Sequence, residues 1–295
     1  KATKAAAARG WDELHRRHVA RQAEAMGRVR LRLAGPRRPD LSTPRRLAAA
    51  DSVEDVGLVE QAFDIGRYLL LGASGAPGAL PPNLQGLWAE GAKPPWGCDF
   101  HLNINLQMAY WPALPTALSE TLAPALRPFL ARLAASGEVA ARSYYGVEGG
   151  GDGAPWVAHG FVDAWALAAP LGPPMWSYCV TCGAWAALLL WESFEFSRSA
   201  EELRALWPLL HGATAFFLAL LRQRNGIGDD GTPLQWGPSH SPENAWMDGA
   251  GATHFLAYDS ALDVAVVSHT FEAAAAAADA LAADRRSLSA AAAAA

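Results

Sequence analysis

The sequence predicts an all-α fold, and three observations lead to this prediction. Apolar residues recur at helical spacing through most of the 295 residues, of which 51% are hydrophobic and 18% are charged. No rhythm of strands alternating with helices runs along the chain. Long connections rich in Gly, Pro and Trp separate the helical segments, and loops of that length tend to carry function.

The predicted helices follow one another along the whole chain. Residues 11–26 place Leu14, His18 and Ala25 near one side, and residues 53–71 follow a cap candidate at Asp51 and Ser52. The clearest strand candidate is the alternation over 29–33. Further helices are predicted over 118–133, 137–145, 176–196, 200–224 and 260–283, and long loops over 72–101, 146–174 and 225–258.

Composition narrows the possible partners. The net charge of −5 is mild and the basic residues are scattered, so we expect no nucleic acid partner. No stretch approaches a transmembrane span, so we expect no membrane. The C-x-x-C pair of Cys179 and Cys182 lies in an Ala- and Trp-rich segment without nearby His, and we interpret it as buried packing rather than a metal or redox site. Without a P-loop, a dinucleotide glycine pattern or H-E-x-x-H, we expect no metal and no organic cofactor.

The segment 82–112 concentrates amides and aromatic rings where a core helix would carry aliphatic residues. Amides supply the paired donors and acceptors that sugar hydroxyls need, and rings stack on sugar C–H faces. The same residue types also cap helices, close turns and fill cores. From His101 to Gln107 every second residue is polar, and in a strand these side chains would share one face. The row of His, Asn, Asn and Gln favours a carbohydrate-binding cleft.

Two motifs resemble those of glycoside hydrolase family 95, the inverting 1,2-α-L-fucosidases. The first is P-x-N-L-Q-G-x-W, ending at Trp88, followed by H-x-N-x-N-x-Q-M-x-Y-W, which begins at His101. The second is P-S-H-S-P-E-N over 238–244. Weaker matches cover nearly the whole chain in order. The resemblance implies a six-hairpin (α/α)6 toroid with a central pocket, of which this chain would supply about the first half to two-thirds.

The resemblance also assigns catalytic roles. Glycoside hydrolysis needs a carboxylic acid that protonates the leaving oxygen, and Glu243 is our candidate, with flanking Trp236 and Trp246 expected to form an apolar wall that keeps it protonated. The alternative is a carboxylate at the start of a short helix, because Ser-Pro-Glu-Asn is also a capping sequence. The family's two water-holding asparagines would be Asn103 and Asn105. The carboxylate that acts as base is expected beyond the end of this chain. Of the acids present, Asp99 is a weak substitute, and neither Asp163 nor Asp259 matches the motif.

Substrate recognition is the next role that the resemblance implies. His101, on the polar face with both asparagines, is expected to bind a sugar hydroxyl. For His159 the choice between sugar contact and core residue stays open. Ala109, Gly160 and two positions where the family has histidine, Leu189 and Ser193, depart from the family pattern. These changes would alter sugar preference, for example towards α-L-galactosides, or reflect relaxed selection on a truncated copy. The predicted substrate-binding residues are His101, Trp88, Gln107, Asp163, Trp176 and His159.

We therefore predict an exo-acting, inverting α-L-fucosidase that removes terminal α-1,2-linked L-fucose from an oligosaccharide or polysaccharide. The alternatives are a catalytically incomplete fragment that at most binds fucosylated glycans, or an α-L-galactosidase of the same family. The domain prediction is a lead-in over 1–50, a partial toroid over 51–289 and an Ala-rich tail over 290–295. Secretion or an extracellular location is expected from the family resemblance alone.

Overall fold

The computed structural model describes residues 2–76, 78–225 and 235–294. Helices hold 57% of the chain, which confirms the all-α class; the toroid stays a prediction. The helices are α1 (Ala2–Arg9), α2 (Trp11–Gly27), α3 (Thr43–Ala48), α4 (Val56–Ser74), α5 (Asn105–Tyr110), α6 (Ala123–Tyr145), α7 (Pro174–Ser177), α8 (Cys182–Ser197), α9 (Ala200–Asn225) and α10 (Ala261–Ala294), with 3-10 turns η1 (Pro95–Cys98) and η2 (Ser119–Thr121).

The strands that the structure describes form three antiparallel pairs, each strand two residues long. One pair joins segments that lie far apart in the sequence, and the other two lie within residues 239–257. The pairs are β1 (Phe100–His101) with β2 (Phe161–Val162), β3 (Ser239–His240) with β6 (Leu256–Ala257), and β4 (Trp246–Met247) with β5 (Thr253–His254).

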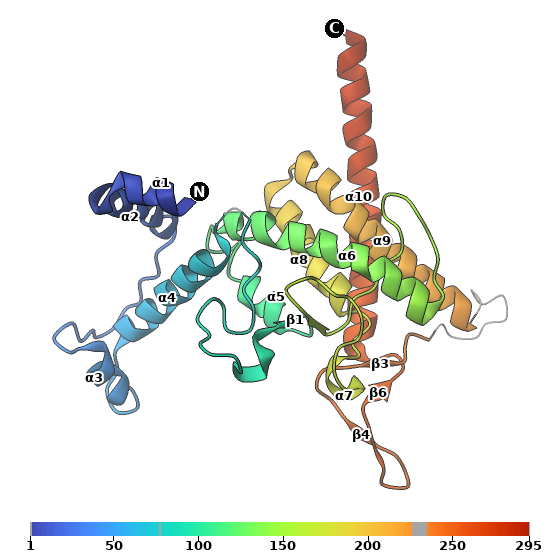
Figure 1. Cartoon of the computed structure of the whole chain (residues 1–295), viewed down its shortest axis with the longest axis horizontal. Helices are drawn as coiled ribbons and strands as arrows, with labels where there is room; N and C mark the ends of the chain where they lie inside the picture. Colours follow the sequence, from blue (N-terminus) through green and yellow to red (C-terminus); the bar gives the residue numbers. More distant parts are fainter. Residues whose placement is uncertain (1, 77, 226–234, 295) are drawn as a thin grey trace.

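The main hydrophobic core lies among α6, α8, α9 and α10 (Figure 1). Helix α9 packs against the other three, and α8 also contacts α5. Phe129 and Leu130 of α6 and Phe216 and Phe217 of α9 are almost completely buried in this core. Helix α8 is apolar on nearly every side, and its neighbours on several sides bury these residues.

Trp156 lies in an extended segment that is held among three of these helices, and each helix faces it with a glycine. A Cβ on Gly137 of α6, Gly183 of α8 or Gly212 of α9 would approach Trp156 side-chain atoms to 3.2, 2.9 and 2.6 Å respectively. The indole Nε1 donates to the carbonyl of Leu209 at 2.8 Å. The glycines therefore allow the helices to close on the ring, and the segment runs on from there to β2.

Three predicted element boundaries are wrong for reasons of long-range contact. The helices expected over 118–133 and 137–145 are one continuous helix, α6, because Gly137 provides close packing rather than a break. The helix expected over 176–196 is two, α7 and α8. The candidate strand over 29–33 pairs with no strand in the described part of the chain; the Leu33 N–H donates instead to Glu60 (2.8 Å), and Arg67 donates to the carbonyl of Val29 (2.8 Å).

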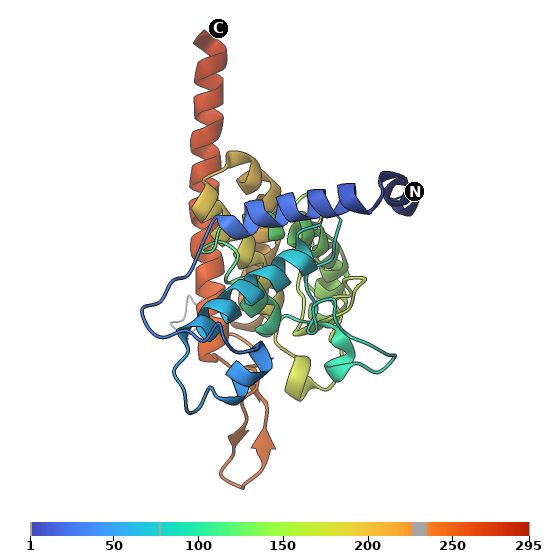
Figure 2. The same ribbon diagram turned by 90° about the vertical axis from the view of Figure 1, so that its left-hand side faces the viewer.

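A buried cation is among the contacts that join α2 to the rest of the protein. Arg67 of α4 is 1% exposed, and its guanidinium donates to the carbonyls of Ala25, Met26, Val29 and Thr116. The four carbonyls accept from the two terminal nitrogens of the guanidinium, while its buried Nε has no hydrogen-bond partner among the described residues. This contact ties α2 to α4 and to the turn before η2. Figure 2 shows α2 lying across α4, and Figures 1 and 2 show the C-terminal part of α10 extending away from the body.

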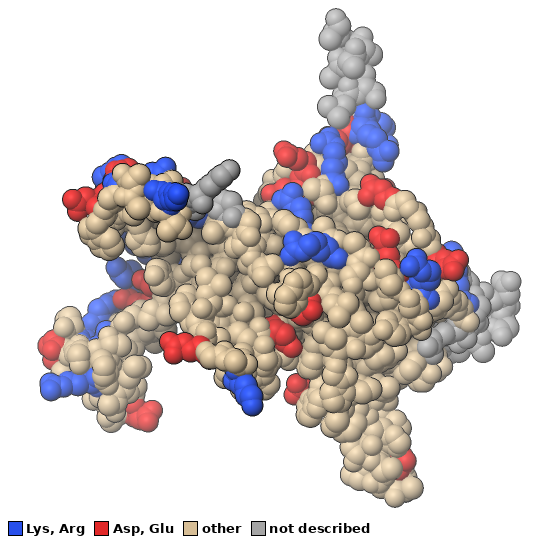
Figure 3. All heavy atoms as spheres, in the orientation of Figure 1, with Lys and Arg blue, Asp and Glu red and all other residues tan. Residues whose placement is uncertain are grey.

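Two helical stretches are long and apolar enough to cross a membrane, by length and composition alone: Ala200–Gln223 and Ala261–Arg286. The sequence-based expectation that no stretch approaches such a span is therefore wrong. Each stretch contains a most apolar window of 18 residues. This window is 50% buried within the protein in the first stretch and 39% buried in the second. Core helices of globular proteins meet the same criterion, so these two stretches are weak evidence for a membrane. On the face drawn in Figure 3, basic and acidic side chains are interspersed.

Candidate active site

Four segments of the chain meet at a pocket of about 440 Å³. The start of α5 contributes two asparagines, the turn after β3 contributes a carboxyl group, and α8 and α10 contribute one apolar side chain each. The pocket thus brings together all three residues predicted to be catalytic. Its lining consists of Asn103, Ile104, Asn105, Trp185, Ser241, Pro242, Glu243 and Leu262.

The two asparagines reach the pocket by a turn and not by a strand. Strand β1 ends at His101, the N–H of Leu102 donates to the carbonyl of Gly160 at 2.7 Å, and α5 begins at Asn105. The alternation of polar and apolar residues from His101 to Gln107 therefore does not correspond to a strand. Gln107 stabilises the turn, because its Nε2 donates to the carbonyl of Leu102 at 2.7 Å.

Asn103 has the arrangement that a water or sugar hydroxyl requires. The residue is only 5% exposed, yet it lines the pocket, and its Oδ1 accepts no hydrogen bond from any residue that the structure describes. A buried amide oxygen without a partner is unfavourable unless water or a ligand supplies the donor. Asn105 is exposed at the first position of α5. Together the two amides offer donors and acceptors to one small polar molecule in the pocket.

Glu243 is the carboxyl group that lines the pocket. It lies in a turn between β3 and β4, so the alternative that it begins a helix is not supported by its conformation. The preceding strand is fixed by His240, whose N–H donates to the carbonyl of Tyr178 (2.8 Å) and whose Nδ1 lies 2.9 Å from the carbonyl oxygen of Phe255. Among the lining residues Glu243 is the sole ionisable side chain.

The two tryptophans expected around Glu243 do not line its pocket, which corrects that prediction. Trp236 is buried against Phe217, with ring centroids 4.9 Å apart. Trp246 is stacked on His254 in the β4–β5 hairpin. Proximity in sequence failed here because the chain turns outward after Glu243. The apolar part of the lining comes from Ile104, Trp185, Pro242 and Leu262.

His101 lies beside the pocket segment, next to an acid. Its Nδ1 lies 2.6 Å from Oδ1 of Asp99, in an orientation that does not satisfy hydrogen-bond geometry, and its ring packs on Phe161 with centroids 4.0 Å apart. Neither His101 nor Asp99 lines the pocket itself. The contact places Asp99 against the imidazole of His101.

Three of the predicted substrate-binding residues have structural contacts. Gln107 is completely buried under the turn that it stabilises. Asp163 closes a turn, because its Oδ1 accepts from the N–H groups of Trp165 and Leu167 at 3.0 Å. His159 is completely buried; its Nδ1 donates to the carbonyl of Ala168 at 2.9 Å.

The second ring nitrogen of His159 is also occupied. Its Nε2 lies 2.6 Å from the hydroxyl of Tyr145. Because Nδ1 faces a carbonyl, it carries the proton, and Nε2 accepts from the tyrosine. Burial lowers the pKa of His159 to about 4. Both nitrogens have protein partners, so this geometry favours the core interpretation of His159 that the sequence left open.

The predicted tryptophans lie outside the pocket. Trp88 is 55% exposed and lines a separate hollow of about 360 Å³ against α4, beside Gln85 and Ala109. Trp176 is 40% exposed on α7, which packs on β3. The structure therefore brings together Glu243 and the two asparagines, and places these two rings apart from them.

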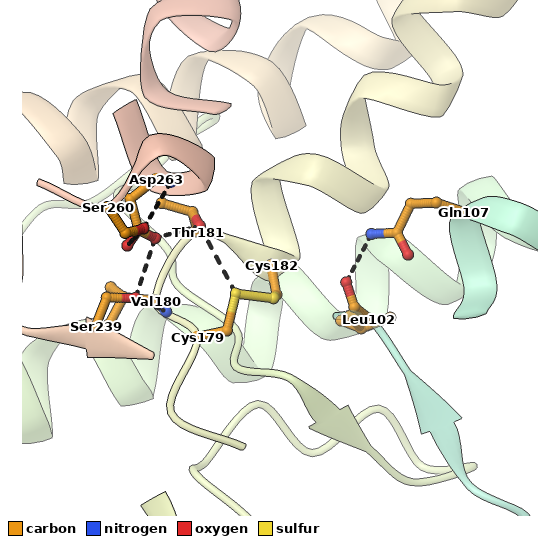
Figure 4. Close-up of a disulfide and its surroundings, with 9 residues drawn as sticks. All are labelled: Leu102, Gln107, Cys179, Val180, Thr181, Cys182, Ser239, Ser260 and Asp263. Atoms are coloured by element: carbon orange, nitrogen blue, oxygen red, sulfur yellow. Dashed lines mark hydrogen bonds between the residues drawn. A yellow bond between two sulfur atoms is a disulfide. The ribbon is translucent and has the colours of Figure 1, made fainter. Parts of the chain in front are cut away.

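A buried carboxylate behind the pocket was missed by sequence reasoning. Asp263 of α10 is completely buried, and its carboxylate accepts hydrogen bonds from the hydroxyls of Thr181, Ser239 and Ser260 at 2.8, 3.0 and 2.6 Å (Figure 4). The N–H of Asp263 donates back to Oγ of Ser260 at 3.2 Å, which caps the first turn of α10. The Ser260–Asp263 spacing before an apolar run was a signal that could have identified it.

The C-x-x-C pair beside this network is a disulfide bond. Cys179 and Cys182 are completely buried, as expected for packing residues, and their sulfur atoms are bonded (Figure 4). The interpretation as packing alone was incomplete, because a C-x-x-C pair at the start of a helix brings its Cβ atoms within reach. Within the described part of the chain, no group of three or more His, Cys, Asp and Glu side chains lies close enough to hold a metal ion.

Comparison with known proteins identifies relatives over almost the whole chain. The model of the glycosyl hydrolase family 95 catalytic domain matches residues 10–295. The chain is 35% identical over 268 residues to "Alpha-L-fucosidase 2" of Arabidopsis thaliana, which covers 88% of this chain and 30% of that protein. It is 32% identical over 241 residues to "Probable alpha-fucosidase A" of Aspergillus niger, covering 81% of this chain and 29% of that protein. The chain thus spans less than a third of the length of these relatives.

Proposed function

The chain belongs to glycoside hydrolase family 95, and we propose that it carries the acid and water-binding residues of an exo-acting, inverting α-L-fucosidase acting on terminal α-1,2-linked L-fucose. The observation that carries this proposal is the pocket shared by Asn103, Asn105 and Glu243. An acid on one side and water-holding amides on the other are the parts that an inverting displacement requires. The names of the matched relatives support L-fucose as the sugar.

In the proposed reaction the oxygen of a water held by Asn103 and Asn105 bonds to the anomeric carbon. The bond from that carbon to the glycosidic oxygen breaks, and the proton of Glu243 moves to the leaving oxygen. The proton lost by water passes to a carboxylate, which we propose lies in a later segment of the full-length protein. Asp259 accepts from the N–H of Trp236 at 2.6 Å, donates its own N–H to the carbonyl of Trp236 at 2.8 Å, and does not line the pocket.

One observation favours the alternative that this segment by itself binds glycans without hydrolysing them. Glu243 is the sole carboxyl group in the lining, so the described pocket contains an acid but no second carboxylate. Asp99 contacts His101 instead. Glycan binding without turnover by residues 1–295, together with turnover by the full-length protein, would support this division.

The test measures fucose release from 2′-fucosyllactose by the full-length protein. We expect Glu243→Gln to lower kcat by about 10²- to 10⁴-fold while binding is kept, because the amide has the same shape but no proton to give. Glu148→Gln, an exposed glutamate outside the pocket, is the matched control and should be unaffected. Less than a tenfold loss for Glu243→Gln would move the acid role to another residue.

The stereochemistry of the product tests inversion separately. Proton NMR during the first minutes of hydrolysis should detect β-L-fucose before mutarotation mixes the anomers, because one displacement at an α-linked carbon inverts it. Initial release of α-L-fucose would exclude the single displacement, and with it the role of the two asparagines in holding the attacking water.

We also propose that the protein is secreted. The disulfide between Cys179 and Cys182 supports this proposal, because such bonds persist in oxidising compartments and are rare in the cytosol. Immunodetection of the full-length protein in the culture medium or cell wall tests this proposal, and retention in the cytosol would contradict it.

A further inference from the structure

The β4–β5 hairpin begins immediately after the proposed acid. Trp246, the first residue of β4, follows Glu243 by three positions. Figures 1 and 2 show that the hairpin projects from the body of the protein as a narrow arm. Over 244–258, Asp248 is the sole acidic residue, and no lysine or arginine is present. The arm is therefore a nearly uncharged surface next to the pocket.

Trp246 is held in one orientation although it is not part of a core. Its Nε1 donates to the carbonyl of Leu256 at 3.0 Å. Its ring is stacked on the imidazole of His254, with centroids 4.5 Å apart and an angle of 25° between the planes. The residue is nevertheless 48% exposed. The indole therefore has its polar group satisfied while much of its ring stays open to solvent.

The supporting imidazole is fixed in turn by an acid. Nε2 of His254 lies 2.8 Å from Oδ2 of Asp248. Oδ1 of the same carboxylate accepts from the N–H groups of Ala250 and Ala252, each at 2.9 Å. The His254 contact and these N–H bonds hold the pKa of Asp248 below its ordinary value, so the carboxylate stays charged. Three linked residues thus preorganise one exposed aromatic ring, which lowers the entropic cost of binding to it.

We propose that Trp246 binds the leaving-group hexose of the substrate by stacking on its C–H face. This inference rests on the proposed function of Glu243. A general acid must lie within hydrogen-bond reach of the glycosidic oxygen. The leaving-group sugar extends from that oxygen out of the pocket, and the chain that turns outward after Glu243 carries the preorganised ring three residues beyond the acid. An exposed indole face and a pyranose C–H face are complementary apolar surfaces.

The test compares two substrates that differ in the leaving group. With 2′-fucosyllactose the leaving group is a sugar, whereas with α-L-fucosyl fluoride it is a single fluoride ion. We expect Trp246→Ala in the full-length protein to raise KM for 2′-fucosyllactose about tenfold, a typical effect of losing one aromatic contact, and to leave the fluoride kinetics unchanged. Trp246→Phe, which keeps an aromatic face, should restore most of the affinity.

Met247→Ala is the matched control. Met247 is the adjacent residue of β4 and is 70% exposed, and in a strand its side chain points to the opposite face. We expect its kinetics to match those of the unmodified protein with both substrates. An equal change for Trp246→Ala with both substrates, or no change with either, would contradict the proposal that Trp246 binds the leaving-group sugar.

A binding measurement separates this inference from the proposed function. Saturation-transfer NMR with free lactose should give a signal that Trp246→Ala abolishes and Met247→Ala keeps. Lactose binding that depends on Trp246, in a protein that releases no fucose, would support sugar binding by Trp246 and contradict the proposed fucosidase activity. Fucose release, together with a lactose signal that is the same in Trp246→Ala, would contradict sugar binding by Trp246 and support the proposed fucosidase activity.

Discussion

The hydroxyl of Thr181 donates a hydrogen bond of 2.8 Å to the carboxylate of Asp263, across 82 positions of the chain. The same carboxylate accepts from Ser239, which lies four residues before Glu243. The neighbours of these residues line the pocket, since Trp185 follows Thr181 in α8 and Leu262 precedes Asp263 in α10. Asp263 therefore ties together the three elements that form one side of the site.

Asp263→Asn should destabilise the protein by about 2–4 kcal/mol, because three hydroxyls donate to the carboxylate and an amide accepts on only one oxygen. Urea unfolding followed by circular dichroism measures the change. Asp279→Asn, at an exposed acid of the same helix, is the control and should stay within about 0.5 kcal/mol. Equal stability of the two variants would show that the network contributes nothing net.

The disulfide next to this network gives a second prediction. The bond between Cys179 and Cys182 closes a ring of four residues. In the chain-entropy model this restriction of the unfolded chain raises the free energy of unfolding by about 2 kcal/mol. Dithiothreitol should therefore lower the Tm of the unmodified protein, and the Cys179→Ala, Cys182→Ala double variant should melt at that lower Tm with or without reductant. Thiol titration of the denatured, unreduced chain should find one free thiol, that of Cys98. Three thiols would contradict the bond.

A third prediction concerns the glycines around Trp156. A Cβ on Gly212 would lie 2.4 Å from the carbonyl oxygen of Ala154 and 2.6 Å from the indole. We expect Gly212→Ala to destabilise by about 1–3 kcal/mol, because backbone and a buried ring must move. At Gly66, also inside a long helix, a Cβ would meet no atom within 4 Å. Gly66→Ala should instead stabilise by about 0.5–1 kcal/mol through helix propensity alone. Urea unfolding should therefore give a lower free energy of unfolding for Gly212→Ala and a higher one for Gly66→Ala.

Local pattern predicted the elements whose contacts are local or follow an apolar stripe. The spacing over 11–26 predicted α2, and that over 200–224 predicted α9, to within a residue at each boundary. Pattern failed where a distant partner decides the conformation. Leu102 pairs with Gly160, so the alternating run becomes a turn and a helix start. Gly137 packs on Trp156, so the expected break in α6 is absent.

The same distinction applies to the site. Short motifs predicted Asn103, Asn105 and Glu243, which meet in one pocket although 138 positions separate Asn105 from Glu243. The spacing of residues could not place Trp88, because which hollow a ring lines depends on how α4 packs. Nor could it assign His159, whose two nitrogen partners, Tyr145 and Ala168, come from separate segments. Contacts of that kind follow from tertiary packing alone.

The last prediction follows from the buried His159. Burial lowers its pKa to about 4 in the folded protein, against about 6.5 in an unfolded chain. Between these values the unfolded state binds the proton and the folded state does not, so stability falls as pH drops from about 6.5 towards about 4. The loss attributable to His159 should reach about 3 kcal/mol at pH 4. Urea unfolding at pH 7, 6, 5 and 4 measures it. His159→Gln should have lower stability at pH 7 but a flatter slope below pH 6.5, whereas His15→Gln, at an exposed histidine of α2, should keep the slope of the unmodified protein. A slope that is identical in all three proteins would contradict the assignment of His159 as a neutral core residue.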